Sequence, residues 1–518
     1  MAHYDCIVIG GGHNGLVAAA YLGRAGKRVL VLERRHVLGG CSSGEELWPG
    51  FKSSPAAYVI SLFLPEIIRD LDLKRHGLEI LPRDPSSFTP LPDGRYLLLG
   101  HDEQANFREI ARFSRRDAEA FPQYNAMLTR IAEAIDPIIA SPPPRLPPRL
   151  GDLGVWWTCL RAVKRLGADL RAAVELLAAP ASRIVNRYFE SEPLKATLAT
   201  DAIIGAMAAP SSPGSAYVLL HHVMGLSGGK RGVWGYVRGG MGGLPDALEK
   251  ACLAAGVEIR RQAPVAAIRV RRGAVAGVAL ADGAEIDAPV VAASVDASQT
   301  FLKLLEPGHL PDDFREQVRN IDYASASAKI NLALDGLPDF RTGPVDRRVA
   351  LRGTTHLCPD LDSIERAFDD ARHGLPSREP VLEITIPSTV DSSLAPAGKH
   401  VASIFVQYAP YQLAEGTWDD RREEFGDRCL DLLAQYAPNI KSLVLHRQVL
   451  TPLDLERTYG LTGGNIMQGA MGLDQLGPLR MPCRTPIRGL YLCGAATHPG
   501  GGVIGACGRI AARIILKT

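Results

Sequence analysis

The N-terminal segment 4–35, YDCIVIGGGHNGLVAAAYLGRAGKRVLVLERR, constrains the fold more than any other part of the chain. Its residues 6–9 form a continuous apolar run rich in β-branched side chains, which predicts a buried strand. Glycines follow, then an alanine-rich stretch over 16–26 that predicts a helix, and then a second apolar run over 27–33. This order predicts a βαβ unit, and hence an α/β fold with a parallel sheet covered by helices.

The turn between the first strand and the helix carries the pattern G-x-G-x-x-G at Gly10, Gly12 and Gly15. The first glycine permits a tight turn, the second lets a pyrophosphate approach the backbone, and the third lets the helix pack closely on the strand. The helix N-terminus directs unpaired N–H groups toward the phosphates. Glu33 ends the second strand, where a carboxylate accepts hydrogen bonds from ribose hydroxyls. An ordinary structural turn is the alternative, but the complete order of elements predicts a dinucleotide site, with NADP disfavoured and FAD and NAD both open.

The composition is that of a globular protein with a large core. Hydrophobic residues make up 46% and charged residues 22% of the 518 residues, a length that predicts two domains. The formal net charge of +2 gives no electrostatic reason to expect a nucleic-acid partner.

The nine cysteines are scattered, with neither a C-x-x-C pair nor metal-ligand spacing. They predict free thiols in a reducing compartment, no metal site and no thiol–disulfide chemistry. An apolar strand begins a few residues after Met1, where a signal peptide would lie, and no apolar run reaches the roughly 18 residues of a membrane span. The expected location is the cytoplasm.

Two further segments are predicted to complete the nucleotide-binding domain. Segment 228–300 combines a helix, with Pro245 in its first turn, and β-rich runs. The glycines at 239–243 follow no apolar strand, so they form no second dinucleotide fingerprint. The C-terminal stretch LYLCGAATHPGGGVIGACG (490–508) joins a short strand to a glycine-rich loop, and a helix is expected to open near Val503.

The nucleotide-binding domain is therefore predicted to be discontinuous, built from 1–60, 228–300 and 486–518. The two insertions between these pieces, 61–227 and 301–485, are long enough to form a substrate domain. The first of them is expected to be mainly helical.

Segment 150–177 combines large apolar side chains with basic ones. Two tryptophans, Trp156 and Trp157, precede four basic residues, Arg161, Lys164, Arg165 and Arg171. A basic helix with aromatic residues can lie on an anionic membrane surface, which makes peripheral membrane contact one interpretation. The other is an exterior helix that packs its apolar face on the core and leaves its charges in solvent.

Several motifs together resemble one family of flavoproteins. They are CIVIGGGHNGLVAAAYLGRAGKRVLVLERR, AYVLLHHVMG, GGMGGLPDALEKA, TPLDLERTYGLTGGNIMQGAMGLDQL, GLYLCGAATHPGGGVIGACGR and the E-R-x-x-x-x-G-G pattern that ends at Gly40. By these motifs the chain resembles the phytoene-desaturase-related flavoproteins, whose wider family includes amine oxidases. Within these it most resembles the branch of pyridine nucleotide-disulphide oxidoreductase domain-containing protein 2, for which segment 454–476 is the most specific.

The resemblance implies a discontinuous Rossmann-type FAD-binding domain with an inserted α+β substrate domain, as in amine oxidases and phytoene desaturases. FAD is the implied cofactor. Carried over position by position, its contacts are Gly10, Gly12, His13, Asn14, Gly15, Glu33, Arg34, Gly40, Cys41, Val265, Gly494, Ala495, Gly502, Val503 and Ile504.

The implied activity is FAD-dependent removal of hydride from a C–H bond of a largely apolar small or lipid-like substrate, with oxygen or a quinone as electron acceptor. Three alternatives stay open. They are an amine or imino-acid oxidase on the same fold, a carotenoid-type desaturase or isomerase, and a flavin-binding scaffold without catalysis.

Two titratable residues are candidates for catalysis beside the flavin. His498, in the loop THPGGG, could tune the flavin or move a proton, or could simply orient the loop through one backbone hydrogen bond. Lys329 falls in the apolar run ASAKINLAL, where an inward amine would be costly unless used. An outward, solvated lysine is the alternative at that position.

Overall fold

The computed structural model describes residues 4–145, 147, 150–227 and 230–518. A five-stranded parallel sheet has the strand order β11-β2-β1-β15-β21. Its strands come from three distant parts of the chain, because β15 lies between β1 and the C-terminal β21. They are β1 (Cys6–Ile9), β2 (Val29–Leu32), β11 (Glu258–Arg260), β15 (Val291–Ala293) and β21 (Leu490–Leu492).

Both faces of this sheet are buried, which explains why its strands read as continuous apolar runs. Successive side chains point to opposite faces: Val8 packs in a cluster with the helices, whereas Ile7 and Ile9 pack in a second cluster on the other face. The helices on the first face are α1 (His13–Arg24), α10 (Gly243–Ala254) and α17 (Ala506–Ile515). The second face is covered by the antiparallel strands β12 (Val265–Arg271), β13 (Ala274–Leu280) and β14 (Glu285–Asp287).

A second, mixed sheet has seven strands in the order β20-β16-β19-β18-β17-β6-β7. Neighbouring strands are antiparallel except β17 and β6, which are parallel. The strands are β6 (Ser87–Pro90), β7 (Tyr96–Leu99), β16 (Ser327–Leu334), β17 (Thr354–Leu357), β18 (Val381–Thr385), β19 (His400–Gln407) and β20 (Val444–Leu450). The first insertion, expected to be mainly helical, therefore also contributes two strands to one edge of this sheet.

One face of the seven-stranded sheet is covered by the long helix α14 (Trp418–Tyr436), whose Trp418, Phe425 and Leu433 pack against Ile330 and Ile404. A group of helices with a core of its own lies beside the two sheets. These helices are α3 (Glu103–Ala111), α4 (Arg115–Ile139), α5 (Leu153–Leu166), α6 (Leu170–Ala178), α7 (Ala181–Tyr188), α8 (Glu192–Ala199) and α9 (Ser215–Val223).

Shorter elements complete the described chain. The strands are β3 (Glu45–Trp48), β4 (Phe51–Ser53), β5 (Ile80–Pro82), β8 (Leu226–Ser227), β9 (Lys230–Arg231) and β10 (Gly235–Val237). The helices are α2 (Pro65–Asp70), α11 (Asp312–Arg319), α12 (Arg347–Ala350), α13 (Leu361–Arg372), α15 (Ile440–Leu443) and α16 (Pro452–Tyr459). In the described part of the chain, no helix combines the length and apolarity needed to cross a bilayer.

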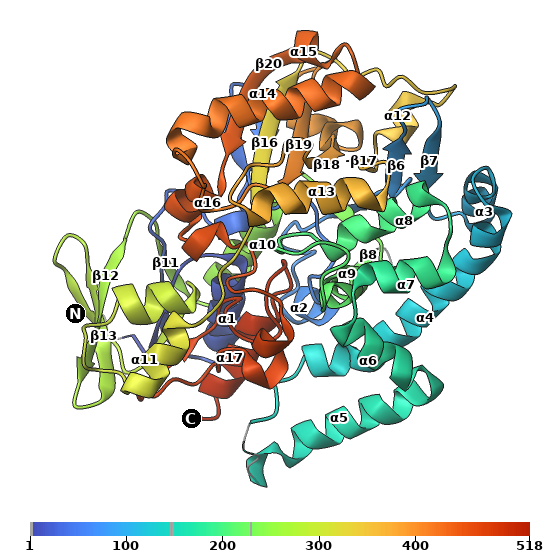
Figure 1. Cartoon of the computed structure of the whole chain (residues 1–518). Helices are drawn as coiled ribbons and strands as arrows, with labels where there is room; N and C mark the ends of the chain where they lie inside the picture. The colour runs from blue at the N-terminus through green and yellow to red at the C-terminus, as the bar shows by residue number, and fades with distance from the viewer. Residues whose placement is uncertain (1–3, 146, 148–149, 228–229) are drawn as a thin grey trace.

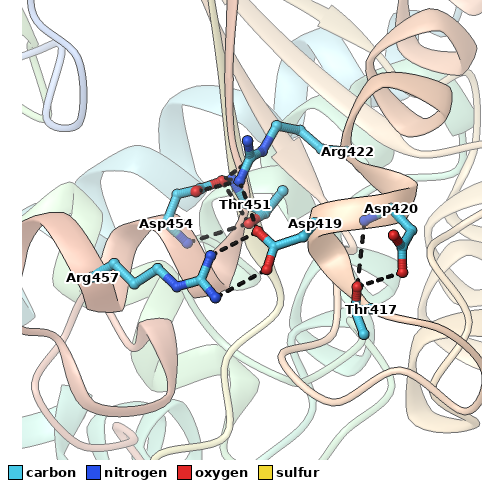
Figure 2. A network of polar contacts seen from close by, with 7 residues as sticks. All are labelled: Thr417, Asp419, Asp420, Arg422, Thr451, Asp454 and Arg457. Atoms are coloured by element: carbon cyan, nitrogen blue, oxygen red, sulfur yellow. Dashed lines mark hydrogen bonds and ion pairs between the residues drawn. The ribbon is translucent and has the colours of Figure 1, made fainter.

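A polar network joins α14 to α16 (Figure 2). The Arg422 guanidinium donates to both carboxylate oxygens of Asp454, at 2.6 and 3.1 Å, and that of Arg457 donates to both oxygens of Asp419, at 2.7 and 3.0 Å. Asp454 also closes a capping box with Thr451 at the start of α16. The network thus fixes α16, which lies in the stretch of sequence most specific to the resembling branch.

Replacing Asp454 with alanine is expected to lower the free energy of unfolding by about 2 kcal/mol, since the change removes half of a capping box and leaves the half-buried Arg422 with only its longer contact to Asp419, at 3.4 Å. Urea or thermal unfolding measures this loss. The matched control is Asp420→Ala, which removes a contact with Thr417 at the start of α14 but no guanidinium partner. An equal loss in the two variants would contradict a special role of the network.

Candidate functional site

A cavity of about 620 Å³ lies between the two sheets and the helices. One end is formed by the C-terminal ends of β1 and β2 and by the start of α1, where a parallel sheet places its ligands. The other end is formed by the seven-stranded sheet together with α4 and α9. Twelve of the residues assigned to a cofactor by resemblance line it: Gly10, Gly12, His13, Asn14, Glu33, Arg34, Gly40, Cys41, Val265, Ala495, Gly502 and Val503.

The glycines of the first loop differ in what surrounds them. Gly10 has a φ of +94°, in the region that favours glycine. A Cβ at Gly15 would clash with the Gly10 carbonyl oxygen, so this glycine packs α1 against the strand instead of lining the cavity. At Gly12, a Cβ would meet no atom closer than Ser294 Oγ at 3.9 Å. The backbone at Gly12 is therefore open to the cavity, as an approaching diphosphate requires.

The Glu33 carboxylate is held in place at the end of β2. Its Oε2 accepts from the backbone N–H of Gly11 and its Oε1 from that of Arg35, both at 2.8 Å. These bonds fix the carboxylate at the edge of the cavity, where a ribose would lie. The adjacent Arg34 donates to the carbonyl oxygens of Arg457 and Thr458 at 3.2 and 2.6 Å, so it ties the loop to the end of α16.

His13 begins α1 and carries a buried Nε2 atom without a hydrogen-bond partner in the described structure. Burial lowers the pKa of this histidine to about 4, so its imidazole is neutral. An unpartnered buried nitrogen at a helix N-terminus beside an open glycine fits a bound dinucleotide, which would supply the missing acceptor or donor.

The C-terminal glycine-rich stretch closes the same cavity. Ala495, Gly502 and Val503 line it, whereas Gly494 and Ile504 lie outside its lining. A Cβ at Gly494 would clash with the Ser294 carbonyl oxygen, so this glycine serves close packing of the chain after β21 against that after β15. The last helix begins at Ala506, three residues later than the sequence pattern indicates.

Four cavity residues form one row across the seven-stranded sheet. Lys329 on β16 lies opposite Phe405 on β19, Phe405 lies opposite Glu383 on β18, and Glu383 lies opposite His356 on β17. Residues directly opposite in neighbouring strands point to the same face of a sheet. All four line the cavity. Lys329 is thus the inward lysine and not the solvated one.

Polar contacts connect this row. Lys329 Nζ contacts Ser403 Oγ and lies 3.9 Å from the centre of the Tyr58 ring. The Tyr58 hydroxyl donates to Glu383 Oε2 at 3.2 Å, and Glu383 Oε1 lies 3.8 Å from His356 Nδ1. One hydrogen bond and two longer contacts therefore join Lys329, Tyr58, Glu383 and His356 along the cavity wall.

Burial changes the charges of these groups. It raises the pKa of Glu383 to about 7, with a contribution from the nearby Asp201 carboxylate, and raises the pKa of Asp201 to about 7 as well. It lowers the pKa of His356 to about 3 and moves that of Lys329 well below its ordinary value. The lysine is therefore disposed to be a neutral amine that can accept a proton.

The remainder of this end of the cavity is largely apolar. Side chains from α4, α8 and α9, and from the adjoining chain, surround the row: Phe121, Leu128, Leu198, Ile204, Leu219, Val223 and Trp234. Such a lining excludes water and suits the apolar part of a substrate.

His498 lies outside the cavity lining. Its imidazole is buried and its Nε2 is 3.0 Å from the carbonyl oxygen of Ile138, at the end of α4. Burial lowers its pKa to about 4. This is the geometry of the loop-orienting interpretation, with one hydrogen bond to the backbone, and a catalytic role for His498 stays a prediction.

Sequence reasoning did not find Glu383, His356 or Asp201. A sequence signal was present for the first two. Glu383 is the single ionisable residue of the β-like run VLEIT, and His356 that of TTHL, just as Lys329 is the single ionisable residue of the run ASAKINLAL. Asp201 lies in a short helical turn after α8 and has no such pattern around it.

A model of the family described as flavin containing amine oxidoreductase matches residues 15–516. The chain belongs to this family. It is 47% identical to the pyridine nucleotide-disulfide oxidoreductase domain-containing protein 2 of Rattus norvegicus over 99% of the chain and 93% of the relative. It is 28% identical to a limonene dehydrogenase subunit of Castellaniella defragrans over 99% of the chain and 94% of that relative.

Among solved structures, a putrescine oxidase variant superposes with a TM-score of 0.62 at 15% identity, over 100% of this chain and 99% of that one. At that identity the likeness shows the fold alone: an FAD-binding Rossmann-type domain with an inserted substrate domain, as in amine oxidases.

The cofactor of this flavin amine oxidoreductase family member is FAD, and the chain is an FAD-dependent oxidoreductase. The open glycine loop, the oriented Glu33 carboxylate and the unpartnered His13 nitrogen fit that cofactor. All nine cysteines are free, although the rat relative's name mentions disulfide chemistry. Within the described residues no cluster of ligands could hold a metal ion.

The raised pKa of Glu383 predicts a pH-dependent stability. In the folded chain this carboxyl keeps its proton up to about pH 7, whereas in the unfolded chain it loses the proton near its ordinary value of 4.5. The contribution of Glu383 to the free energy of unfolding therefore falls by about 3 kcal/mol as pH rises through this window, in addition to that of Asp201. We expect Glu383→Gln, which stays neutral, to remove this fall.

Thermal unfolding of the FAD-loaded protein at pH 5 and pH 8 tests this expectation. Glu365→Gln is the matched control, because Glu365 bonds only Ser211 in the described contacts and lies near the surface. A pH dependence that is the same in wild type and Glu383→Gln would show that Glu383 ionises normally.

Proposed function

We propose that the chain removes hydride from a C–H bond of a largely apolar, small or lipid-like substrate and leaves a double bond. The observation that carries this proposal is one continuous cavity, which joins the cofactor cradle at Gly12 and Glu33 to an apolar end beside Lys329. The similarity to a limonene dehydrogenase subunit supports an apolar substrate, since the name of that relative gives a hydrocarbon.

Bound FAD supplies the hydride acceptor for this chemistry. The residues of the chain bind and orient the cofactor through the glycine loop and Glu33, and the apolar wall keeps water away from the reacting carbon. Forming a double bond removes a hydride and a proton from neighbouring atoms. The Nζ of Lys329, which lies over the Tyr58 ring, would accept the proton in its neutral form, which burial favours.

The carboxyl pair Asp201 and Glu383 favours a second candidate function, oxidation of an amine. Both carboxyls line the cavity, and in their ionised form they would anchor a cationic nitrogen. Arg83 partly opposes this, because its guanidinium also lines the cavity and would repel a cationic nitrogen, although its charge lowers the pKa of both carboxyls and so favours their ionised form. For either substrate, oxygen or a quinone would take the electrons from the reduced cofactor.

Anaerobic mixing with a substrate panel tests both candidates. The FAD-loaded protein is mixed with terpenes, polyenes, fatty acyl compounds and amines, and bleaching of the visible flavin absorbance is followed. Bleaching by apolar compounds alone supports the proposal. Bleaching by amines alone, lost in Asp201→Asn, supports the second candidate and overturns the first.

Two further outcomes of the same panel are informative. Isomerisation of a polyene without net bleaching would replace the proposal with a carotenoid-type isomerase. No bleaching by any compound, although dithionite reduces the flavin, would favour a flavin-binding scaffold.

A further inference from the structure

Helices α5 and α6 expose an unusual number of large apolar side chains. Leu153, Trp157 and Leu160 on α5 are 68%, 57% and 59% exposed, and Val174 on α6 is 57% exposed. Other exposed large apolar residues of the described chain are scattered. Exposed large apolar side chains gathered on two helices in contact indicate an interaction site. The α5–α6 surface comprises Leu153, Trp157, Leu160, Val163, Leu170, Val174 and Leu177.

The helical spacing shows that the exposure is organised. Residues 153, 157 and 160 stand at i, i+4 and i+7 and so form one stripe along α5. On α6, residues 170, 174 and 177 repeat the same spacing. The side of α5 that packs on the protein carries the buried Ala162 and Leu166 and the half-buried Trp156. The three residues of the stripe therefore point away from the core.

Four exposed cations border these stripes: Arg161, Lys164, Arg165 and Arg171. Among the described residues, none of them has a carboxylate within 4.0 Å. Arg161 instead lies over the Trp157 ring, 5.3 Å from its centre.

The acidic residues of the same segment are all paired with arginines outside it. Asp152 bonds Arg145, Asp169 bonds Arg130, and Glu175 bonds Arg187. The acidic charges are thereby neutralised, and the surface presents apolar side chains edged by positive charge.

We propose that the α5–α6 surface docks on an anionic phospholipid bilayer. Exposed apolar stripes with a tryptophan and flanking cations are what an interfacial helix needs to enter the headgroup region. A second copy of the chain fits less well, because a two-fold interface would pair the same surface on both copies and bring the cations of the two copies together. The anionic headgroups of a bilayer complement the cations of the surface, and the acyl chains beneath them complement its apolar side chains.

The position of α5 connects this surface to the cavity. Helix α5 lies along the outer edge of the molecule, below α4 and α6 (Figure 1). It packs on α4, and α4 lines the apolar end of the cavity with Phe121, Tyr124 and Leu128. Helix α4 therefore lies between the docking surface and the apolar end of the cavity. This arrangement suits an enzyme that takes an apolar substrate from a membrane, an interpretation that rests on the proposed function.

Co-sedimentation of the full-length, FAD-loaded protein with vesicles tests the proposal. The vesicles contain phosphatidylcholine with roughly a third phosphatidylserine, and vesicles of phosphatidylcholine alone are the comparison. We expect binding to the anionic vesicles that weakens as salt is raised. The triple variant R161Q/K164Q/R165Q should bind about a hundredfold less tightly, and W157S/L160S about tenfold or more.

Matched variants separate this surface from a general effect of charge or hydrophobicity. K74Q/R271Q/K303Q removes three exposed cations elsewhere, and L253S/L445S removes two exposed leucines elsewhere. Both should bind vesicles like wild type, and all variants should keep their FAD. Equal vesicle binding by the α5–α6 variants and wild type would overturn the proposal. Dimers in solution that W157S/L160S dissociates, without vesicle binding, would overturn it in favour of a second copy.

Discussion

Replacing Gly15 with alanine is expected to abolish FAD binding and to destabilise the chain by about 3 kcal/mol or more. The new Cβ would clash with the Gly10 carbonyl oxygen and would lie 3.1 Å from Ser294 Cβ. Both neighbours are part of the buried junction between α1, β1 and β15, so neither can move without displacing the cofactor loop. The measurements are flavin absorbance of the purified protein and its thermal unfolding midpoint.

The control for this prediction is Gly343→Ala. Gly343 is exposed, a Cβ added to it would meet no atom within 4 Å, and its backbone is not left-handed. We expect this variant to bind FAD and unfold like wild type. A Gly15→Ala protein that keeps its full complement of flavin would show that α1 and β1 pack less closely than the structure has them.

Replacing Lys329 with methionine is expected to slow reduction of the flavin by substrate about a hundredfold while leaving FAD bound. Methionine fills nearly the same volume, so the cavity wall is retained, but the proton acceptor beside Tyr58 is lost. Because burial lowers the pKa of Lys329 and favours its neutral amine, the wild-type rate should fall as pH drops and the amine is protonated. Anaerobic stopped-flow bleaching with the substrate found in the panel measures both effects.

Lys399→Met provides the comparison for Lys329→Met. Lys399 is a partly exposed lysine that pairs with Asp335 at 2.7 Å, away from the cavity. Its loss should leave the rate of flavin reduction unchanged. Equal rates for wild type and Lys329→Met would assign the proton transfer to another group and leave Lys329 a structural role.

The cofactor end of the site was predictable from the sequence because its determinants are local. Gly10, Gly12 and Glu33 lie within one βαβ unit, and each follows from a short-range requirement of a turn, a close approach or a strand end. The C-terminal stretch was also placed correctly on the same sheet, since β21 pairs with β15. Resemblance to a family then supplied the choice of FAD.

The substrate end could not be predicted in the same way. Lys329, Glu383 and His356 are far apart in the sequence, and they meet only because three antiparallel pairings place them in one row. A shift of one residue in any pairing would turn a side chain to the opposite face. No local pattern encodes that register, which also decides whether the lysine is buried.

Segment 150–177, on the surface of the molecule, likewise has one property that follows from its local sequence and one that depends on tertiary contacts. Its sequence already indicated a helix with apolar and basic sides, because periodicity is a local property. Whether the apolar side packs on the core or faces outward depends on which side α4 occupies, and that is settled by tertiary packing. The sequence by itself determined the cofactor cradle and the chemistry of the family. The tertiary structure decided the polar row and the exposed surface, because both depend on contacts between distant segments.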